Sequence, residues 1–306
     1  MASGRVLLRR QTELMKQSIA DGRVGIAGFG AIGRAFAARW ADHDVSPVVF
    51  DIDPAARTAA AEAGLPVVES IVALAERCEI ISLIVRTDAD VLDVVNTLIT
   101  GTSVTGAPTN DVTGLRALIV HSTVTPDTVR YAAEVLSTLD VIVIDACPTE
   151  IPSAVRTGAY AMLVGGADDD VAALTPYLRG LADDVRHLGA LGAGSVTKMA
   201  KNLQIAADRI LVHELLDICL AAGVDPTDFL DMLRDTGYGS SRPVAQYWES
   251  VFNPDTGSTW PAMGSNLFQK DVPLATEFAA DVGVATPMLR ALAASCAALV
   301  DEATRR

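Results

Sequence analysis

The first 190 residues alternate between two apolar patterns. Short runs rich in valine and isoleucine predict buried strands, and segments with helical periodicity lie between them. The expected strands are Val24–Ala27, Val48–Asp51, Ile80–Val85, Ala117–His121, Val141–Asp145 and Ala159–Val164. The expected helices include Ala31–Asp42, Ser70–Arg77, Asp90–Thr100 and Pro126–Leu139, and Gly101–Gly114 has the composition of a surface loop. Strands that alternate with helices predict an α/β fold with a Rossmann-type, doubly wound and mainly parallel sheet.

The pattern changes near Leu188 and becomes helical to the end of the chain. A long periodic helix is expected over Ser195–Ala222, and the shorter helices expected after it are Thr227–Arg234, Val244–Val251, Asp271–Val282 and Pro287–Ala303. We therefore expect three parts: a short amphipathic N-terminal extension over residues 1–22, a dinucleotide-binding domain over residues 23–190, and an all-helical substrate and dimerisation domain over residues 191–306.

A GxGxxG pattern directly follows the first expected strand and opens the next helix. Its residues are Gly28, Phe29, Gly30, Ala31, Ile32 and Gly33. In a dinucleotide site the first glycine permits a tight turn, the second lets the backbone approach a pyrophosphate, and the third lets the helix pack on the sheet. The helix N-terminus adds partial positive charge. The alternative is an ordinary strand–helix turn, but the position of the pattern favours a cofactor site.

The next expected strand ends at Asp51, eighteen residues after Gly33. An acidic residue at this place can accept hydrogen bonds from an adenosine ribose and repels a 2′-phosphate. The sequence therefore favours NAD over NADP, although Arg57 follows closely and can offset that repulsion.

A second chemical signal lies where the helical part begins. Glycines lead into a helix on which Lys198 and Asn202 are four residues apart, the spacing that places two side chains on one helical face. A partly buried lysine near an oxidised nicotinamide has its pKa lowered toward neutrality, where it exchanges protons with an alcohol. Most single lysines are solvated, as we expect for Lys201. Lys198, by contrast, follows directly after the predicted dinucleotide-binding domain, and this position makes Lys198 the candidate acid/base residue.

Composition narrows the class of protein further. The formal net charge of −14 argues against nucleic-acid binding, and no apolar run reaches the roughly 18 residues of a membrane span. The N-terminal residues lack the continuous apolar stretch of a signal peptide. The four cysteines and four histidines are scattered, which predicts reduced thiols in a cytoplasmic protein and no metal site.

Several segments share the pattern of one enzyme family. They are the glycine loop, Val85-Arg86, His121–Pro126, Gly192–Asn202 and Phe268–Val272. Together they resemble the β-hydroxyacid dehydrogenase superfamily, which includes 3-hydroxyisobutyrate dehydrogenases and tartronate semialdehyde reductases and has a 6-phosphogluconate dehydrogenase-like C-terminal domain. The resemblance implies cofactor contacts from Val85, Arg86, Thr123 and Lys270, and it places Asp271 beside the substrate. The family usually has Leu-Pro where this chain has Val85-Arg86.

One segment departs from the family pattern. The substrate loop of the family usually reads Asp-Ala-Pro-Val-Ser-Gly-Gly, whereas Asp145–Ile151 reads Asp-Ala-Cys-Pro-Thr-Glu-Ile. Thr149 can replace the serine hydroxyl, but Glu150 replaces a glycine and repels an anion. Two interpretations stay open: the substrate is neutral, larger or carries an amine, or Glu150 turns outward or pairs with Arg156.

These observations predict an NAD(P)-dependent dehydrogenase or reductase that acts on a small molecule. The substrate would be a β-hydroxyacid-like or a related neutral or amino alcohol, with Lys198 as acid/base and Asn202 and Thr149 orienting its oxygen atoms. Two alternatives stay open: an imine reductase of the same fold, which generally has Asp or Tyr in place of the lysine, and a non-catalytic NAD-binding sensor or assembly protein. The long apolar helix and the family resemblance both predict a homodimer.

Overall fold

The computed structural model describes residues 2–101, 114–236 and 267–305. The chain forms two compact units, Met1–Lys198 and Met199–Arg306, called the first and second unit below. The helix expected at Val244–Val251 and most of the loop expected at Gly101–Gly114 lie outside the described residues.

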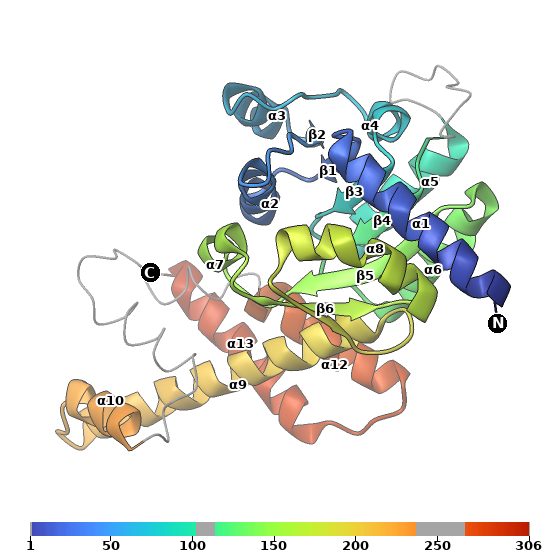
Figure 1. Cartoon of the computed structure of the whole chain (residues 1–306). Helices are drawn as coiled ribbons and strands as arrows, with labels where there is room; N and C mark the ends of the chain where they lie inside the picture. Colours follow the sequence, from blue (N-terminus) through green and yellow to red (C-terminus); the bar gives the residue numbers. More distant parts are fainter. Residues whose placement is uncertain (1, 102–113, 237–266, 306) are drawn as a thin grey trace. The chain divides into compact units, whose positions relative to one another are not determined.

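The first unit is built on a seven-stranded sheet with the order β2-β1-β3-β4-β5-β6-β7 (Figure 1). The strands are β1 (Val24–Ala27), β2 (Val48–Phe50), β3 (Ile80–Leu83), β4 (Ala117–Val120), β5 (Ile142–Pro148), β6 (Ala161–Gly165) and β7 (Asp184–His187). All neighbouring strands pair in parallel except β5 and β6, which are antiparallel. The predicted mainly parallel, doubly wound sheet is confirmed.

Two features of the sheet escaped the sequence prediction. The edge strand β7 reads Asp-Val-Arg-His and contains no apolar run. Its residues are partly buried or exposed. Strand β6 runs antiparallel to β5, and only the short helix α7 (Pro152–Thr157) lies between the two strands. Strand direction is set by the path of the connection, which the apolar pattern of a strand does not encode.

Helices cover both faces of the sheet because its strands are apolar on both faces. On one face the core includes Phe36 and Trp40 from α2 (Ala31–Ala41) and Tyr177 from α8 (Asp168–Leu181). On the other face α4 (Ile71–Arg77), α5 (Asp88–Thr100) and α6 (Pro126–Leu136) contribute Leu74, Leu98 and Leu136. Helix α3 (Pro54–Glu62) follows β2.

The N-terminal extension forms helix α1 (Ala2–Ala20), which packs against α8. It buries Met15 and Ser18. The Ser18 hydroxyl donates to the buried carboxylate of Glu79, which also pairs with Arg23 at 2.5 Å and Arg116 at 3.3 Å. Glu79 directly precedes β3, so α1 is anchored at the amino edge of the sheet.

The described residues of the second unit form helices and no strand. Helix α9 (Ala193–Ala221) begins in the first unit and continues into the second, and α10 (Pro226–Asp235) follows it. A π-helical turn over Leu267–Asp271 leads into α12 (Val272–Asp281), and α13 (Pro287–Arg305) ends the chain's described part. Among the described helices, none combines the length and apolar character that a membrane crossing requires.

Candidate active site

The glycine loop joins β1 to α2 at the carboxyl edge of the sheet. Here the strand order changes direction between β1 and β3, the place where doubly wound sheets bind ligands. Gly28 has φ +103°, and a Cβ on it would lie 2.0 Å from the Ile84 carbonyl oxygen. A Cβ on Gly33 would lie 2.0 Å from the Gly28 carbonyl oxygen. Packing of the protein itself therefore requires glycine at both positions.

Gly30 differs, because a Cβ on it would meet nothing within 4 Å. It is exposed and precedes α2 without a side-chain cap. The first N–H groups of an uncapped helix attract anions, and the helix dipole adds to that attraction. The open space at Gly30 and the uncapped helix start fit the pyrophosphate of a dinucleotide. Ala31 and Ile32 belong to this first turn.

Asp51 lies directly after β2 and is fixed on the loop. Its Oδ2 accepts from the Phe29 N–H at 2.6 Å, and its Oδ1 accepts from the Asp53 N–H at 2.8 Å. Arg57 donates to the carbonyl oxygens of Asp51 and Ile52 and pairs with Glu69 at 3.3 Å. The arginine is therefore engaged with backbone oxygens and a second carboxylate, while the Asp51 carboxylate stays in place beside the loop.

The segments after β3 and β4 are tied together at the same edge. The Val85 N–H donates to the Ser122 hydroxyl at 2.9 Å, which brings Val85 and Arg86 next to Ser122 and Thr123. Arg86 is exposed, and Thr123 is partly buried. The structure thus brings these three predicted cofactor residues to the carboxyl edge, together with the glycine loop.

A buried polar network beneath this edge was missed by the sequence analysis. The hydroxyl of Ser82 lies 2.8 Å from His121 Nε2 and 3.0 Å from the Tyr177 hydroxyl, and His121 Nδ1 lies 2.6 Å from the Ala146 carbonyl oxygen. The His121 ring also packs edge-on against Phe36. Burial lowers the pKa of His121 to about 4, against a weaker opposing effect of the Ala146 hydrogen bond. A neutral ring has one donor and one acceptor, so both of its nitrogens are satisfied.

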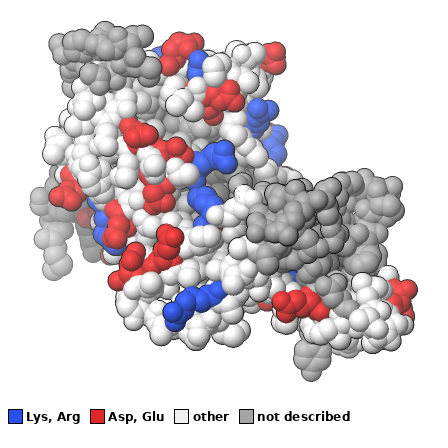
Figure 2. Space-filling model, turned by 180° about the vertical axis from the view of Figure 1, so that it is seen from behind, with Lys and Arg blue, Asp and Glu red and all other residues white. Residues whose placement is uncertain are grey.

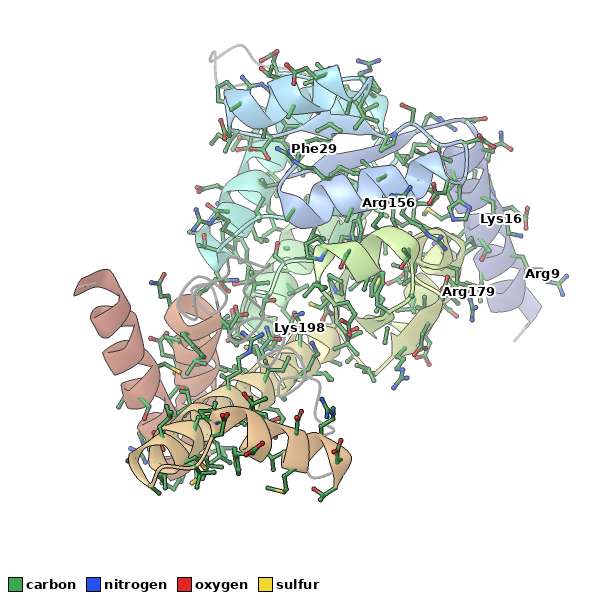
Figure 3. All side chains as sticks on the ribbon, turned by 90° about the vertical axis from the view of Figure 1, so that its left-hand side faces the viewer. Arg9, Lys16, Phe29, Arg156, Arg179 and Lys198 are labelled. Atoms are coloured by element: carbon green, nitrogen blue, oxygen red, sulfur yellow. The ribbon has the colours of Figure 1, made fainter. Side chains whose placement is uncertain are left out.

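The candidate acid/base residue, Lys198, lies near the start of α9 and is partly buried (Figure 3). Its Nζ donates to the Pro148 carbonyl oxygen, at the end of β5, at 2.6 Å. Thr149 and Glu150 follow directly and are also partly buried. Arg156 pairs with Asp42, the residue directly after α2. The first unit therefore brings Lys198 to the substrate loop that the sequence predicted.

In the second unit three further predicted residues lie together. The Asn202 amide donates to Asp271 Oδ2 at 2.7 Å, and Lys270 Nζ lies 3.4 Å from Asp271 Oδ1. Asn202 is buried, and the π-helical turn presents Lys270 and Asp271. Such turns occur frequently at functional sites.

Charge on the surface agrees with the acidic composition. Figure 2 shows Asp and Glu side chains spread over one face, with Lys and Arg between them.

Within the described ranges, no group of three or more His, Cys, Asp or Glu side chains has a metal-binding arrangement.

The fold and the loop define a dinucleotide-dependent enzyme, and comparison with known families agrees. A family model described as the NAD binding domain of 6-phosphogluconate dehydrogenase matches residues 23–189. A second, described as NAD-binding of NADP-dependent 3-hydroxyisobutyrate dehydrogenase, matches residues 192–306. The chain belongs to the β-hydroxyacid dehydrogenase superfamily and is an NAD(P)-dependent dehydrogenase of CH–OH donors. The predicted family, enzyme class and cofactor type are confirmed.

Individual proteins are similar over most of the chain. Human mitochondrial 3-hydroxyisobutyrate dehydrogenase is 26% identical over 261 residues, 84% of this chain and 75% of the relative. The structure of Mycobacterium tuberculosis 3-hydroxyisobutyrate dehydrogenase with L-serine has a TM-score of 0.74 at 20% identity and covers 91% of this chain and 93% of that one. An imine reductase variant from Myxococcus stipitatus with NAD+ has a TM-score of 0.61 at 16% identity, with coverage of 92% and 93%. These two structures share the fold.

The buried His121 makes folding stability depend on pH. An unfolded histidine binds a proton below about pH 6.5, whereas the folded ring binds one only below about pH 4. The unfolded state therefore binds more protons in this window, and stability falls as pH falls through it, by about 3 kcal/mol in total. We expect His121→Gln, which cannot titrate, to have a shallower loss of its urea midpoint between about pH 7 and pH 4.5. Equal pH slopes for the two proteins would contradict this account.

Proposed function

We propose that the enzyme interconverts an alcohol and a carbonyl, with Lys198 as the residue that takes or gives the hydroxyl proton. The nicotinamide, when bound, accepts or supplies the hydride. The observation that carries the proposal is the partly buried Lys198 ammonium, which the Pro148 carbonyl oxygen holds at 2.6 Å. A solvated lysine would need no such anchor, and a group that transfers protons must be held within hydrogen-bond reach of its substrate.

Asn202 follows Lys198 by four residues on α9, a spacing that favours one helical face. We propose that its amide orients the substrate oxygen, together with the Thr149 hydroxyl. The hydrogen bond to Asp271 supports this role because it fixes the plane of the amide. In the same proposal Lys270 reaches the cofactor and Asp271 borders the substrate, as the family resemblance implies.

The proposed cofactor preference is NAD. The support is the Asp51 carboxylate, held beside the glycine loop by two backbone N–H groups, because a fixed negative charge repels a 2′-phosphate. Arg57 lowers this repulsion less than the sequence alone suggested, since its guanidinium already contacts two carbonyl oxygens and Glu69.

For the substrate, we propose a molecule that is neutral, larger than a simple hydroxyacid, or carries an amine. Glu150 is partly buried next to the loop that contacts Lys198, and its charge disfavours a substrate carboxylate there.

An imine reductase is the second candidate, and the fold shared with the Myxococcus stipitatus protein favours it. Lys198 argues against it, because such relatives generally have Asp or Tyr at that position. Membership in a dehydrogenase family argues against a non-catalytic sensor. We also propose a cytoplasmic location, which is supported by four cysteines that form no disulfide among the described residues.

Replacing the proposed acid/base residue tests the mechanism. We expect Lys198→Ala to bind NADH as the wild type does and to lose about 10²- to 10⁴-fold in kcat, since proton transfer contributes that much. Fluorescence titration gives the dissociation constants of NADH for both proteins. The same titration of the wild type with NADPH tests the proposed preference for NAD. Lys201→Ala is the matched control and keeps its turnover. A Lys198→Ala enzyme with near-normal kcat would remove this lysine from the reaction.

The role of Glu150 predicts a substrate profile. We expect kcat/KM to be about tenfold higher for neutral and amino alcohols than for unsubstituted 3-hydroxyacids, since repulsion between two charges at about 4 Å costs 1 to 4 kcal/mol. Glu150→Gln keeps the shape, removes the charge and narrows this ratio. Highest efficiency of the wild type with a simple 3-hydroxyacid would rule the proposal out.

We also propose a homodimer formed through the second unit. Exposed apolar side chains follow α9, including Leu211 at 56%, Ile218 at 64% and Leu220 at 57% exposure. Burying such residues favours association. Light scattering is expected to give twice the chain mass of 32.1 kDa, and a monomer mass would contradict this proposal.

A further inference from the structure

Asp145 is a carboxylate buried in the middle of β5. Its exposure is 0%, and both of its oxygens accept backbone N–H groups, from Gly192 at 2.7 Å and from Ser195 at 2.7 Å. These donors lie just before and within the first turn of α9, where helix N–H groups have no partner inside the helix. The positive end of the helix dipole also favours an anion at this position. The carboxylate therefore ties the start of α9 to the sheet.

The surrounding backbone leaves room for this carboxylate and nothing larger. A Cβ on Gly165 would lie 2.4 Å from Asp145 Oδ1. A Cβ on Gly194 would lie 2.8 Å from Asp145 Oδ2 and 2.4 Å from the Leu163 carbonyl oxygen. The two glycines and the carboxylate therefore fit together tightly, and the position of the helix start is set within narrow limits.

The same strand also holds the lysine. Strand β5 ends at Pro148, whose carbonyl oxygen accepts the Lys198 ammonium at 2.6 Å. Lys198 follows Ser195 by three residues, a rise of about 4.5 Å along the helix. Strand β5 thus contacts the beginning of α9 at two points, through a side chain at Asp145 and through the backbone at Pro148. A displacement of the helix start at the first point displaces the ammonium at the second.

Stability alone does not explain a carboxylate at this place. Burial raises the pKa of Asp145, although the N–H groups of Gly192 and Ser195 oppose that effect, so ionising it in the fold has a net cost. A serine or threonine at the helix N-cap would satisfy an N–H group without burying a charge. A carboxylate from the neighbouring strand does what a local cap does not, because it fixes the helix relative to β5.

We propose that Asp145 is a positioning residue that holds the start of α9 on β5 and so places the Lys198 ammonium for proton transfer. The proposal rests on the proposed function, in which Lys198 is the acid/base residue. Asp145 acts through Lys198 and needs no contact with substrate or cofactor.

Asp145→Asn tests this role, because it keeps the shape and one acceptor but turns an NH₂ group toward a backbone N–H. We expect kcat to fall about 10- to 100-fold per folded molecule, since a misplacement of about 1 Å can cost that much, with the NADH dissociation constant unchanged. A second readout needs no turnover: competitive acetylation by limiting acetic anhydride over a pH series, read by mass spectrometry. We expect the acetylation midpoint of Lys198 to move to lower pH, because the ammonium loses a nearby negative charge and its fixed carbonyl partner. Lys201 in the same digest is the internal reference.

Glu79→Gln is the matched control. Glu79 is also a buried carboxylate of the first unit, but it lies at the amino edge of β3 and contacts Ser18, Arg23 and Arg116. This variant is expected to lose stability and to keep the wild-type kcat per folded molecule and the wild-type acetylation midpoint of Lys198.

The outcomes separate this proposal from the proposed function. A Lys198→Ala enzyme with full turnover defeats both. An inactive Lys198→Ala enzyme together with normal kcat and acetylation in Asp145→Asn defeats only the role of Asp145. Asp145→Ser, which fits the same space, replaces the Asn variant if the latter does not fold. If both fail to fold while Glu79→Gln folds, or if activity only follows the folded fraction, Asp145 is purely structural and the proposal is overturned.

Discussion

Hydrogen bonding of buried titratable groups is the constraint that organises the carboxyl edge of this sheet. Groups without access to water must find partners in the protein, or the fold loses several kcal/mol for each. His121 satisfies this constraint as a neutral ring, whereas Asp145 satisfies it with partners that suit a negative charge. The neutral imidazole has one donor and one acceptor, and it contacts an acceptor at Ala146 and a hydroxyl at Ser82. The carboxylate contacts only donors, an arrangement that suits the ionised form although burial raises its pKa.

For the three glycines of the cofactor loop, the sequence motif and the structure give different reasons why each position is glycine. The motif assigns each glycine a role by analogy with other dinucleotide sites, and the structure shows which of these roles the protein itself requires. In the structure, Gly28 and Gly33 are required by neighbouring carbonyl oxygens 2.0 Å from where a Cβ would lie. Gly30 faces open space, so no contact within the protein requires it to be glycine. A ligand that approaches the backbone closely is the remaining physical reason for glycine there, and the uncapped start of α2 supplies the charge that such a ligand needs.

Much of the fold was predictable from local patterns in the sequence. Contacts between segments that are far apart in the sequence were not predictable. The strand Val24–Ala27 and the helix after the glycine loop were predicted because periodicity and turn residues are properties of neighbours in sequence. The roles of His121 and Asp145 were not, since their partners are 25 to 50 residues away along the chain. A signal for Asp145 did exist: a carboxylate directly after the apolar run Ile142–Ile144 in a strand buried on both faces requires an explanation. The polar edge strand Asp184–His187 offered no comparable signal.

The contact between β5 and α9 links the sheet, which carries the predicted cofactor loop, to the helix that carries Lys198. A parallel sheet can place its strand ends accurately because each strand is fixed by its neighbours, but a helix that begins beyond the sheet has no ladder to hold it. A carboxylate that receives two N–H groups from the helix start extends the hydrogen bonding of the sheet into the helix. Proton transfer needs this accuracy more than binding does, since its rate depends steeply on distance and orientation. In the proposed mechanism, the cost of burying Asp145 therefore falls where an error in position would affect proton transfer by Lys198 most.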